Sequence, residues 1–137
     1  DGDGVIDLAH SPADAIGSVA NYFKSYGWQP GKVALFDVKL DPAKVNLGVL
    51  LAPDILPSFR PEQLTAAGLE LPQAAQDYKG LLALIELWNG DPAVAGNEKQ
   101  YFLGTDNFYA ITRYNQSSYY AMAVLDLGAA IRERAGF

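Results

Sequence analysis

The sequence contains no cysteine and a single histidine, His10, among its 137 residues. The absence of cysteine excludes disulfide bonds, thiol nucleophiles and cysteine-ligated zinc, and one histidine cannot by itself supply a histidine-rich metal site. No apolar run approaches the roughly 18 residues at which a sequence predicts a membrane-spanning helix. The composition therefore predicts no transmembrane segment and none of these metal or thiol chemistries.

Positive charge is also scarce. There are 10 Lys or Arg residues against 16 Asp or Glu, which gives a formal net charge of −6, and the basic residues form no run. This balance disfavours nucleic acid and anionic membranes as main partners and is compatible with a neutral sugar polymer. The chain length and a hydrophobic content of 50% predict a single globular domain.

Several catalytic motifs are missing: the sequence has no P-loop, no GxGxxG, no GxSxG elbow and no HExxH. Glycosidic cleavage needs a carboxylic acid that is held protonated in an apolar pocket. Asp106 lies beside an aromatic segment and Glu86 lies within an apolar run, but neither stands in a recognisable catalytic motif. We expect Asp106 at a helix end and Glu86 on a sheet face.

The densest chemistry lies in residues 107–122, NFYAITRYNQSSYYAM, which contain five Tyr or Phe rings and an arginine. Aromatic rings with hydroxyl tips, beside amide and guanidinium groups, suit a cleft that stacks on sugar faces and hydrogen-bonds to their rims. The alternative is that these aromatics form the core of a helical hairpin. We expect Asn107 to cap a short helix that runs to Tyr114, and Ser117 or Ser118 to cap a second helix.

The first 14 residues, DGDGVIDLAHSPAD, resemble the middle and end of an EF-hand calcium loop, with Gly4 at its sharp turn. His10 occupies the position where a bidentate glutamate is expected, so a later carboxylate must close the loop. The first ligand position precedes the chain, which we therefore expect to be cut from a longer one. The alternative is an Asp/Gly-rich turn without metal. The predicted ligands are Asp1, Asp3, the carbonyl of Val5, and Asp14.

Local signals predict helices at both ends of the chain and a β-rich middle. Ser11-Pro12 begins a helix that Gly27 ends, and its apolar residues recur at helical spacing as Ile16, Val19, Ala20 and Phe23. The proline-rich stretch 42–72 predicts short strands and loops, interrupted by a short helix at 61–67. The other expected elements are a short strand that begins at Lys32, a buried strand 81–88, its hairpin partner 99–103 after the turn at 89–92, and a closing helix 119–135.

Two of these segments carry a resemblance to a known family. Residues 13–28, ADAIGSVANYFKSYGW, and 107–124, NFYAITRYNQSSYYAMAV, resemble segments of the lytic murein transglycosylase B family, in the same order and at a comparable interval. These bacterial enzymes cleave peptidoglycan strands. The resemblance implies an α+β fold, a lysozyme-like transglycosylase core fragment. Its expected parts are a calcium loop and helix at 1–31, a small antiparallel β-rich insertion at 32–104, and a cleft segment with a closing helix at 105–137.

The resemblance also implies a mechanism that uses one glutamic acid. This acid protonates the oxygen between N-acetylmuramic acid and N-acetylglucosamine, then accepts the proton of the muramyl 6-hydroxyl, which gives a 1,6-anhydro product. In the family the glutamate belongs to a Glu-Ser motif upstream of the calcium loop, and this sequence contains no Glu-Ser. We therefore expect no catalytic residue in this chain and expect the missing N-terminal part of the enzyme to supply it.

Where the family motifs match, the resemblance assigns substrate-binding roles. It implies calcium as a cofactor, peptidoglycan glycan strands as the partner and a periplasmic location, with any outer-membrane attachment through a lipid anchor outside this chain. Tyr22 would line the cleft near the catalytic acid, Asn115 would donate its amide near the reacting sugar, Tyr114 and Tyr120 would form aromatic walls, and Tyr109 and Arg113 are further candidates.

Two other interpretations remain open at this point. The sequence DGDGVIDL also suits a non-catalytic calcium-dependent binding module of the dockerin type, although a dockerin needs two such repeats and one is visible. The second interpretation is a structural domain in which all of the aromatic residues belong to the core.

Overall fold

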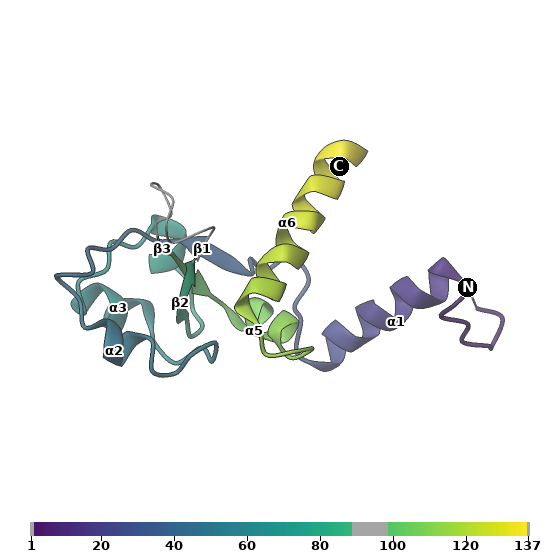
Figure 1. Cartoon of the computed structure of the whole chain (residues 1–137), viewed down its shortest axis with the longest axis horizontal. Coiled ribbons are helices and arrows are strands. Elements are labelled where there is room, and N and C mark those ends of the chain that lie inside the picture. The colour runs from purple at the N-terminus through teal and green to yellow at the C-terminus, as the bar shows by residue number, and fades with distance from the viewer. Residues whose placement is uncertain (1, 89–98, 137) are drawn as a thin grey trace.

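The computed structural model describes residues 2–88 and 99–136. Figure 1 shows α1 and α6 at one end, the small helices α2 and α3 at the other, and the sheet and α5 between them. None of the described helices is long and apolar enough to cross a membrane. The elements are α1 Pro12–Ser25, β1 Leu35–Asp37, α2 Leu47–Leu50, α3 Pro61–Ala66, α4 Gln73–Gln76, β2 Ala83–Trp88, β3 Lys99–Gly104, α5 Asp106–Thr112 and α6 Ser118–Ala135.

Helix α1 begins and ends where its local signals predict. The Ser11 hydroxyl accepts a hydrogen bond from the Asp14 amide at 3.3 Å, Pro12 is the first helical residue, and Gly27 has a φ of +91°. The apolar stripe of α1 is largely uncovered, however: Ile16 is 70% exposed and no residue of the helix is buried. Only its C-terminal end packs on the hydrophobic core, and the helix projects outward (Figure 1).

The sheet has the order β1-β3-β2, and both pairings are antiparallel. Strand β2 faces β3 along its whole length, with Glu86 opposite Tyr101, which confirms the predicted hairpin. The predicted turn at 89–92 lies outside the described residues. Strand β1 pairs only with the last part of β3, from Phe102 to Gly104.

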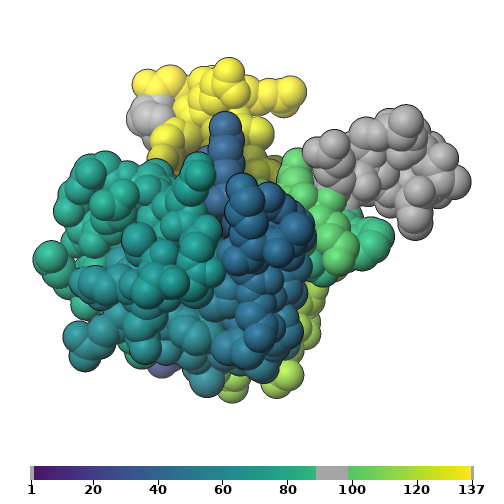
Figure 2. Space-filling view, turned by 90° about the vertical axis from the view of Figure 1, so that its left-hand side faces the viewer, coloured from purple at the N-terminus to yellow at the C-terminus, as the bar shows by residue number. Residues whose placement is uncertain are grey.

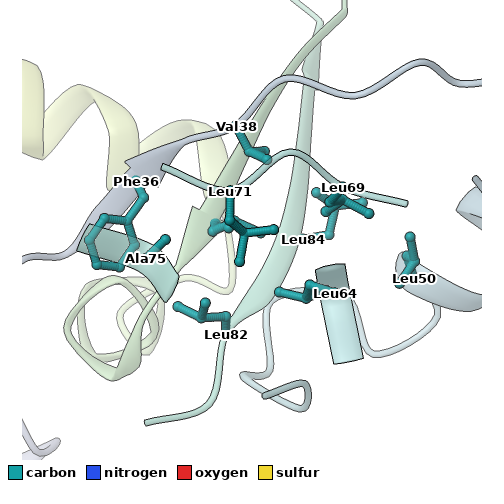
Figure 3. Close-up of a cluster of buried hydrophobic side chains, with 10 residues drawn as sticks. Phe36, Val38, Leu50, Leu64, Leu69, Leu71, Ala75, Leu82 and Leu84 are labelled. Carbon is teal, nitrogen blue, oxygen red and sulfur yellow. The ribbon is translucent and has the colours of Figure 1, made fainter. Parts of the chain in front are cut away.

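The two faces of the sheet support two hydrophobic cores. On one face, the segment that carries α2, α3 and α4 packs on the sheet and forms a continuous surface at this end of the molecule (Figure 2). On the other face, α5 and α6 cover Ile85 and Leu87 with Phe108, Ile111 and Ala121. The first core, drawn in Figure 3, consists of Phe36, Val38, Leu50, Leu64, Leu69, Leu71, Ala75, Leu82, Leu84 and Leu103.

Two short helices were not predicted. The single-turn helices α2 and α4 lie in and just after the proline-rich stretch that the sequence assigns to strands and loops. Each is held by one buried side chain, Leu50 in α2 and Ala75 in α4, and Asn46 caps α2. A helix of one turn has almost no intrinsic stability, so tertiary packing and not propensity determines these two elements. The predicted helix at 61–67 is confirmed as α3.

Helix α5 differs from its predicted bounds. Thr105, not Asn107, is its cap, because the Thr105 hydroxyl accepts the Asn107 amide at 3.1 Å, and the helix ends at Thr112 before Tyr114. Asp106 is exposed in its first turn, as expected for a residue at a helix end. Ser117 caps α6 by accepting the amide of Tyr120, which confirms the predicted start of the closing helix.

Candidate functional site

Three tyrosines from distant parts of the chain form a continuous set of ring contacts. The Tyr22 ring, on α1, lies edge-on to the Tyr114 ring, with centroids 6.1 Å apart. The Tyr114 ring, in the connection between α5 and α6, stacks on the Tyr120 ring of α6 at 5.4 Å. Tyr26, at the end of α1, contacts Tyr22 at 4.5 Å. We call Tyr22, Tyr26, Tyr114 and Tyr120 the aromatic wall.

A tight connection between α5 and α6 brings Tyr114 and Tyr120 together. Gln116 adopts a positive φ of 55° and its amide donates to the Thr112 carbonyl, so the chain reverses immediately after α5. Ser117 then starts α6, which places Tyr120 in its first turn. One ring therefore precedes the reversal and its stacking partner follows it.

Buried Asn107 holds the end of α1 against α5. Its Oδ1 accepts the Gln29 amide at 2.8 Å, and its Nδ2 donates to the carbonyls of Gln29 and Lys32, both at 2.9 Å. The neighbouring Thr105 hydroxyl donates to the Val33 carbonyl at 2.8 Å. The prediction that Asn107 caps the helix is wrong: its side chain instead holds the linker between α1 and β1, and this linkage positions Tyr22 beside Tyr114.

The wall presents ring surface to solvent. Tyr114 is 66% and Tyr26 is 47% exposed, whereas Tyr22 and Tyr120 are partly buried. Burial raises the pKa of the Tyr22 hydroxyl, and the neighbouring Tyr26 hydroxyl raises it further, so Tyr22 stays protonated at neutral pH and can donate a hydrogen bond. Exposed rings that carry hydroxyl donors suit the apolar faces and polar rims of sugars.

The other predicted substrate-binding residues lie at the edges of the wall. The Arg113 Nη1 donates to the Tyr109 hydroxyl at 3.1 Å, and the guanidinium lies 5.4 Å from the Tyr109 ring centroid and 5.9 Å from that of Tyr26. Asn115 is exposed directly after Tyr114, and its backbone amide donates to the Thr112 carbonyl. The structure thus links all the predicted residues except Asn115 by side-chain contacts.

Tyr26 was missed by the sequence analysis. The sequence contained a signal that Tyr26 lies beside Tyr22. Tyr26 follows Tyr22 by four residues at the end of a predicted helix, and residues at this spacing lie on the same helix face. The resemblance drew attention to Tyr22 alone.

A large groove of about 1740 Å³ lies elsewhere, between the β1 and β3 edge of the sheet and α6. Tyr119 and Met122 line it from α6, whereas no residue of the aromatic wall does. The groove is lined by aromatic side chains too, but by none of the residues to which the family resemblance assigns a substrate-binding role. We place the candidate site at the wall, because those residues converge there and their rings contact one another.

The N-terminal loop has part of the geometry of a calcium loop. Gly4 has a φ of +86°, the conformation that the sharp turn requires, and Asp3 Oδ1 accepts the Val5 amide at 2.8 Å. Asp14 reaches back to the loop, where its Oδ2 accepts the Asp7 amide at 3.1 Å. Within residues 2–88 and 99–136, no three carboxylate, imidazole or thiol groups are arranged to hold a metal, and the predicted ligand Asp1 lies outside this part of the chain.

Glu86 lies on the sheet face, as predicted, at the centre of a hydrogen-bond network. Its Oε2 accepts from the Tyr101 hydroxyl at 2.9 Å and from Lys99 at 3.2 Å, and its Oε1 accepts from the Trp88 indole at 3.1 Å. Burial raises the pKa of Glu86, but the bonds from Tyr101, Trp88 and Lys99 outweigh it and hold this pKa below its usual range. Burial and Glu86 raise the pKa of Tyr101 to about 12. A general acid needs a raised pKa, so Glu86 acts as a structural anion.

Replacing Glu86 with glutamine is expected to lower the free energy of unfolding by about 1–2 kcal/mol at neutral pH, because the three hydrogen bonds to the carboxylate lose their charge assistance. The pKa of Glu86 is lower in the folded chain than in the unfolded chain, where it is about 4.3. Its carboxylate therefore stabilises the fold fully above that unfolded pKa, and this stabilisation is lost as the pH falls through the folded pKa. Urea unfolding near neutral pH and in acid should therefore show a difference that shrinks in acid. The exposed Glu133→Gln is the control; a pH-independent difference for Glu86→Gln would contradict this role.

The chain matches a known protein family over most of its length. The family model of the transglycosylase SLT domain matches residues 1–129. The membrane-bound lytic murein transglycosylase B of Escherichia coli (strain K12) is 42% identical over 131 residues, which cover 95% of this chain and 32% of that protein. This chain therefore spans about a third of the length of its curated relative.

Solved structures give the same result. The soluble lytic transglycosylase SltB1 from Pseudomonas aeruginosa aligns with a TM-score of 0.80 and 33% identity, over 100% of this chain and 42% of that one. The Escherichia coli lytic transglycosylase Slt35, solved in complex with calcium, aligns with a TM-score of 0.75 and 38% identity, over 97% of this chain and 38% of that one. These matches confirm the lysozyme-like α+β fold, and together with the sequence matches they show that this chain belongs to the transglycosylase SLT domain family, in its lytic murein transglycosylase B branch.

Proposed function

We propose that this chain forms one side of the glycan cleft of a lytic transglycosylase, which cleaves peptidoglycan between N-acetylmuramic acid and N-acetylglucosamine and releases 1,6-anhydromuramyl products. The observation that supports this most strongly is the contact of Tyr22 with Tyr114 and Tyr120 across the chain. In this proposal Tyr114 and Tyr120 stack on sugar rings, and the Tyr22 hydroxyl hydrogen-bonds near the reacting sugar. Asn115, exposed beside Tyr114, donates its amide to the same ligand.

The proton donor of this reaction belongs to another part of the enzyme. Among the described glutamates, Glu62, Glu70 and Glu133 are exposed, and Glu86 has a lowered pKa, so none has the apolar surroundings that keep a carboxylic acid protonated. The chain supplies binding and orientation, and the acid protonates the leaving oxygen before taking the proton of the muramyl 6-hydroxyl.

The exposed apolar stripe of α1 supports the presence of a further packing partner. Ile16 and Val19 are 70% and 54% exposed, and Leu127 and Ile131 of α6 are 61% and 54% exposed. We propose that the N-terminal part of the same enzyme covers these side chains. The acid would then lie opposite the aromatic wall.

Incubation with purified peptidoglycan tests the proposed division of roles. The 137-residue chain alone is expected to bind glycan strands and to release no 1,6-anhydromuropeptides, as measured by mass spectrometry. Release by this chain at a rate like that of a full-length family member would show that the acid lies within it and overturn the assignment. No binding of glycan by a folded chain would overturn the proposed cleft.

Calcium binding by the N-terminal loop is part of the proposal. The positive φ of Gly4 and the return of Asp14 to the loop support it, as does the calcium complex of the relative Slt35. Asp1, Asp3, the Val5 carbonyl and Asp14 would hold the ion, and its role would be to fix the start of α1, because Asp14 lies in the first turn of that helix.

Calcium is expected to raise the unfolding temperature of the chain, and magnesium to raise it less, because a calcium loop adapts poorly to the smaller ion. A calcium concentration about 100 times the dissociation constant stabilises by about 2.7 kcal/mol. Differential scanning calorimetry with and without chelator measures the effect, and Asp14→Asn should abolish it while Asp41→Asn leaves it unchanged. An equal response of both variants would place the ion elsewhere.

We propose a periplasmic location for the enzyme. The curated relative is described as membrane-bound, whereas no described helix of this chain could span a bilayer. A lipid anchor outside these residues would reconcile the two. The comparisons give no support to the dockerin-like alternative.

A further inference from the structure

Arg113 is a cation at the edge of the aromatic wall, and its side chain donates one hydrogen bond to the described part of the chain. It follows the last residue of α5, and one of its five N–H donors is directed to the Tyr109 hydroxyl at 3.1 Å. In the described part of the chain, every carboxylate is too far away to form an ion pair with it. Arg113 is thus a partly buried guanidinium without a carboxylate partner among the described residues.

The position of this guanidinium is fixed from two sides. The Tyr109 hydroxyl holds Nη1, and the ring of Tyr26 lies 5.9 Å from the guanidinium carbon. Tyr26 is half-exposed and contacts Tyr22 at 4.5 Å, so it joins the cation to the sugar-stacking rings. A ligand that lies along the wall would bring its next substituent to Arg113.

We propose that Arg113, oriented by Tyr109 and flanked by Tyr26, forms a subsite that binds a carboxylate carried by the glycan ligand. This inference rests on the proposed function, because it needs a sugar chain on the aromatic wall. The planar guanidinium matches a carboxylate with two parallel hydrogen bonds, and the neighbouring rings reduce its exposure to solvent. A polymer of N-acetylglucosamine carries no carboxylate, so this subsite would distinguish peptidoglycan from a neutral glycan.

The carboxylate can have two sources in peptidoglycan. One is the lactyl group of a muramic acid from which the peptide has been removed, and the other is the stem peptide attached to that group. In an intact muropeptide the lactyl carboxyl is an amide and carries no charge. The two sources can therefore be separated by the choice of ligand.

The test is a calorimetric titration of the 137-residue chain with three ligands: neutral chitotetraose, peptide-free peptidoglycan tetrasaccharide, and the tetrasaccharide with its stem peptides. The wild-type chain is expected to bind at least one carboxylated ligand roughly tenfold more tightly than chitotetraose, and added salt should reduce this preference. The carboxylated ligand that carries the preference identifies the source.

Arg113→Gln should abolish the preference for carboxylated ligands, because the positive charge and the paired N–H donors of the guanidinium are lost. It should leave the affinity for chitotetraose within about twofold of the wild type, because the aromatic rings remain. Arg113→Lys, which keeps the charge, should retain only part of it, and Tyr109→Phe should weaken it by releasing the guanidinium. Arg132→Gln removes an exposed arginine of α6 and is the matched control, with no expected change.

Each other outcome is decisive. Equal losses for neutral and carboxylated ligands on Arg113→Gln would show that Arg113 only supports the rings and would overturn the subsite while leaving the cleft in place. A wild-type chain without any preference would do the same, even if the variants failed to fold. Failure of the folded wild type to bind any of the three ligands would overturn the proposed function itself.

Discussion

Replacing Asn107 with alanine is expected to destabilise the chain by about 3 kcal/mol, because three part-buried hydrogen bonds are lost and each typically contributes about 0.5–1.5 kcal/mol. The side chain is 2% exposed, and its three hydrogen bonds go to the backbone of Gln29 and Lys32. The loss is measured as the shift in the midpoint of urea unfolding at an unchanged slope.

The same substitution should disturb the site at a distance. Since Asn107 pins the segment after α1, its loss frees Tyr22 from Tyr114 and should lower the affinity for glycan, although Asn107 is itself buried away from solvent. Asn115→Ala is the matched control for stability, because this residue is exposed and a surface substitution costs within about 0.5 kcal/mol. An Asn107→Ala chain as stable as the wild type would contradict the linker role.

Removal of the stacked pair is expected to have the largest effect on binding. Tyr114→Ala or Tyr120→Ala should each reduce glycan affinity about tenfold, because each ring lost from a stacking surface removes roughly 1–1.5 kcal/mol. Tyr120→Phe should retain most of the affinity if stacking dominates. Isothermal titration with a peptidoglycan tetrasaccharide gives the dissociation constants.

Tyr119 offers a matched control for this prediction. It precedes Tyr120 in α6 and is 53% exposed, but its hydroxyl accepts the Trp88 amide at 2.9 Å on the sheet side of the helix. Tyr119→Ala should therefore leave glycan affinity nearly unchanged. If Tyr119→Ala weakened binding as much as Tyr120→Ala, the ligand would lie on the other side of α6 and the wall would not be the site.

The sequence predicted the helices whose ends carry capping residues, proline or glycine. Ser11-Pro12 and Gly27 bound α1, Pro61 begins α3, and Ser117 caps α6, because each signal acts on the neighbouring backbone alone. The single-turn helices α2 and α4 depend on packing: Asn46 caps α2, but a helix of one turn is stable only where a buried side chain holds it, Leu50 in α2 and Ala75 in α4. Their existence could not be read from local sequence.

The candidate site was predictable in part. The resemblance identified Tyr22, Tyr114 and Tyr120, whose convergence the structure then showed. The role of Asn107 was not predictable, because its partners at Gln29 and Lys32 are remote in sequence and are backbone groups, which leave no pattern of residue types. The exposure of the apolar stripe of α1 could not be predicted either, because helical spacing shows which residues share a face but not whether another element covers that face.

One nuclear magnetic resonance experiment tests the central claim most directly. In the free chain, ring protons of Tyr22 should show cross-peaks to those of Tyr114, and Tyr114 to those of Tyr120. On titration with peptidoglycan tetrasaccharide, the resonances of these three rings should shift together with one dissociation constant, while those of Tyr78, packed against the opposite core, stay unchanged. Separate rings in the free chain, or a ligand that shifts other residues and leaves these three untouched, would contradict the account.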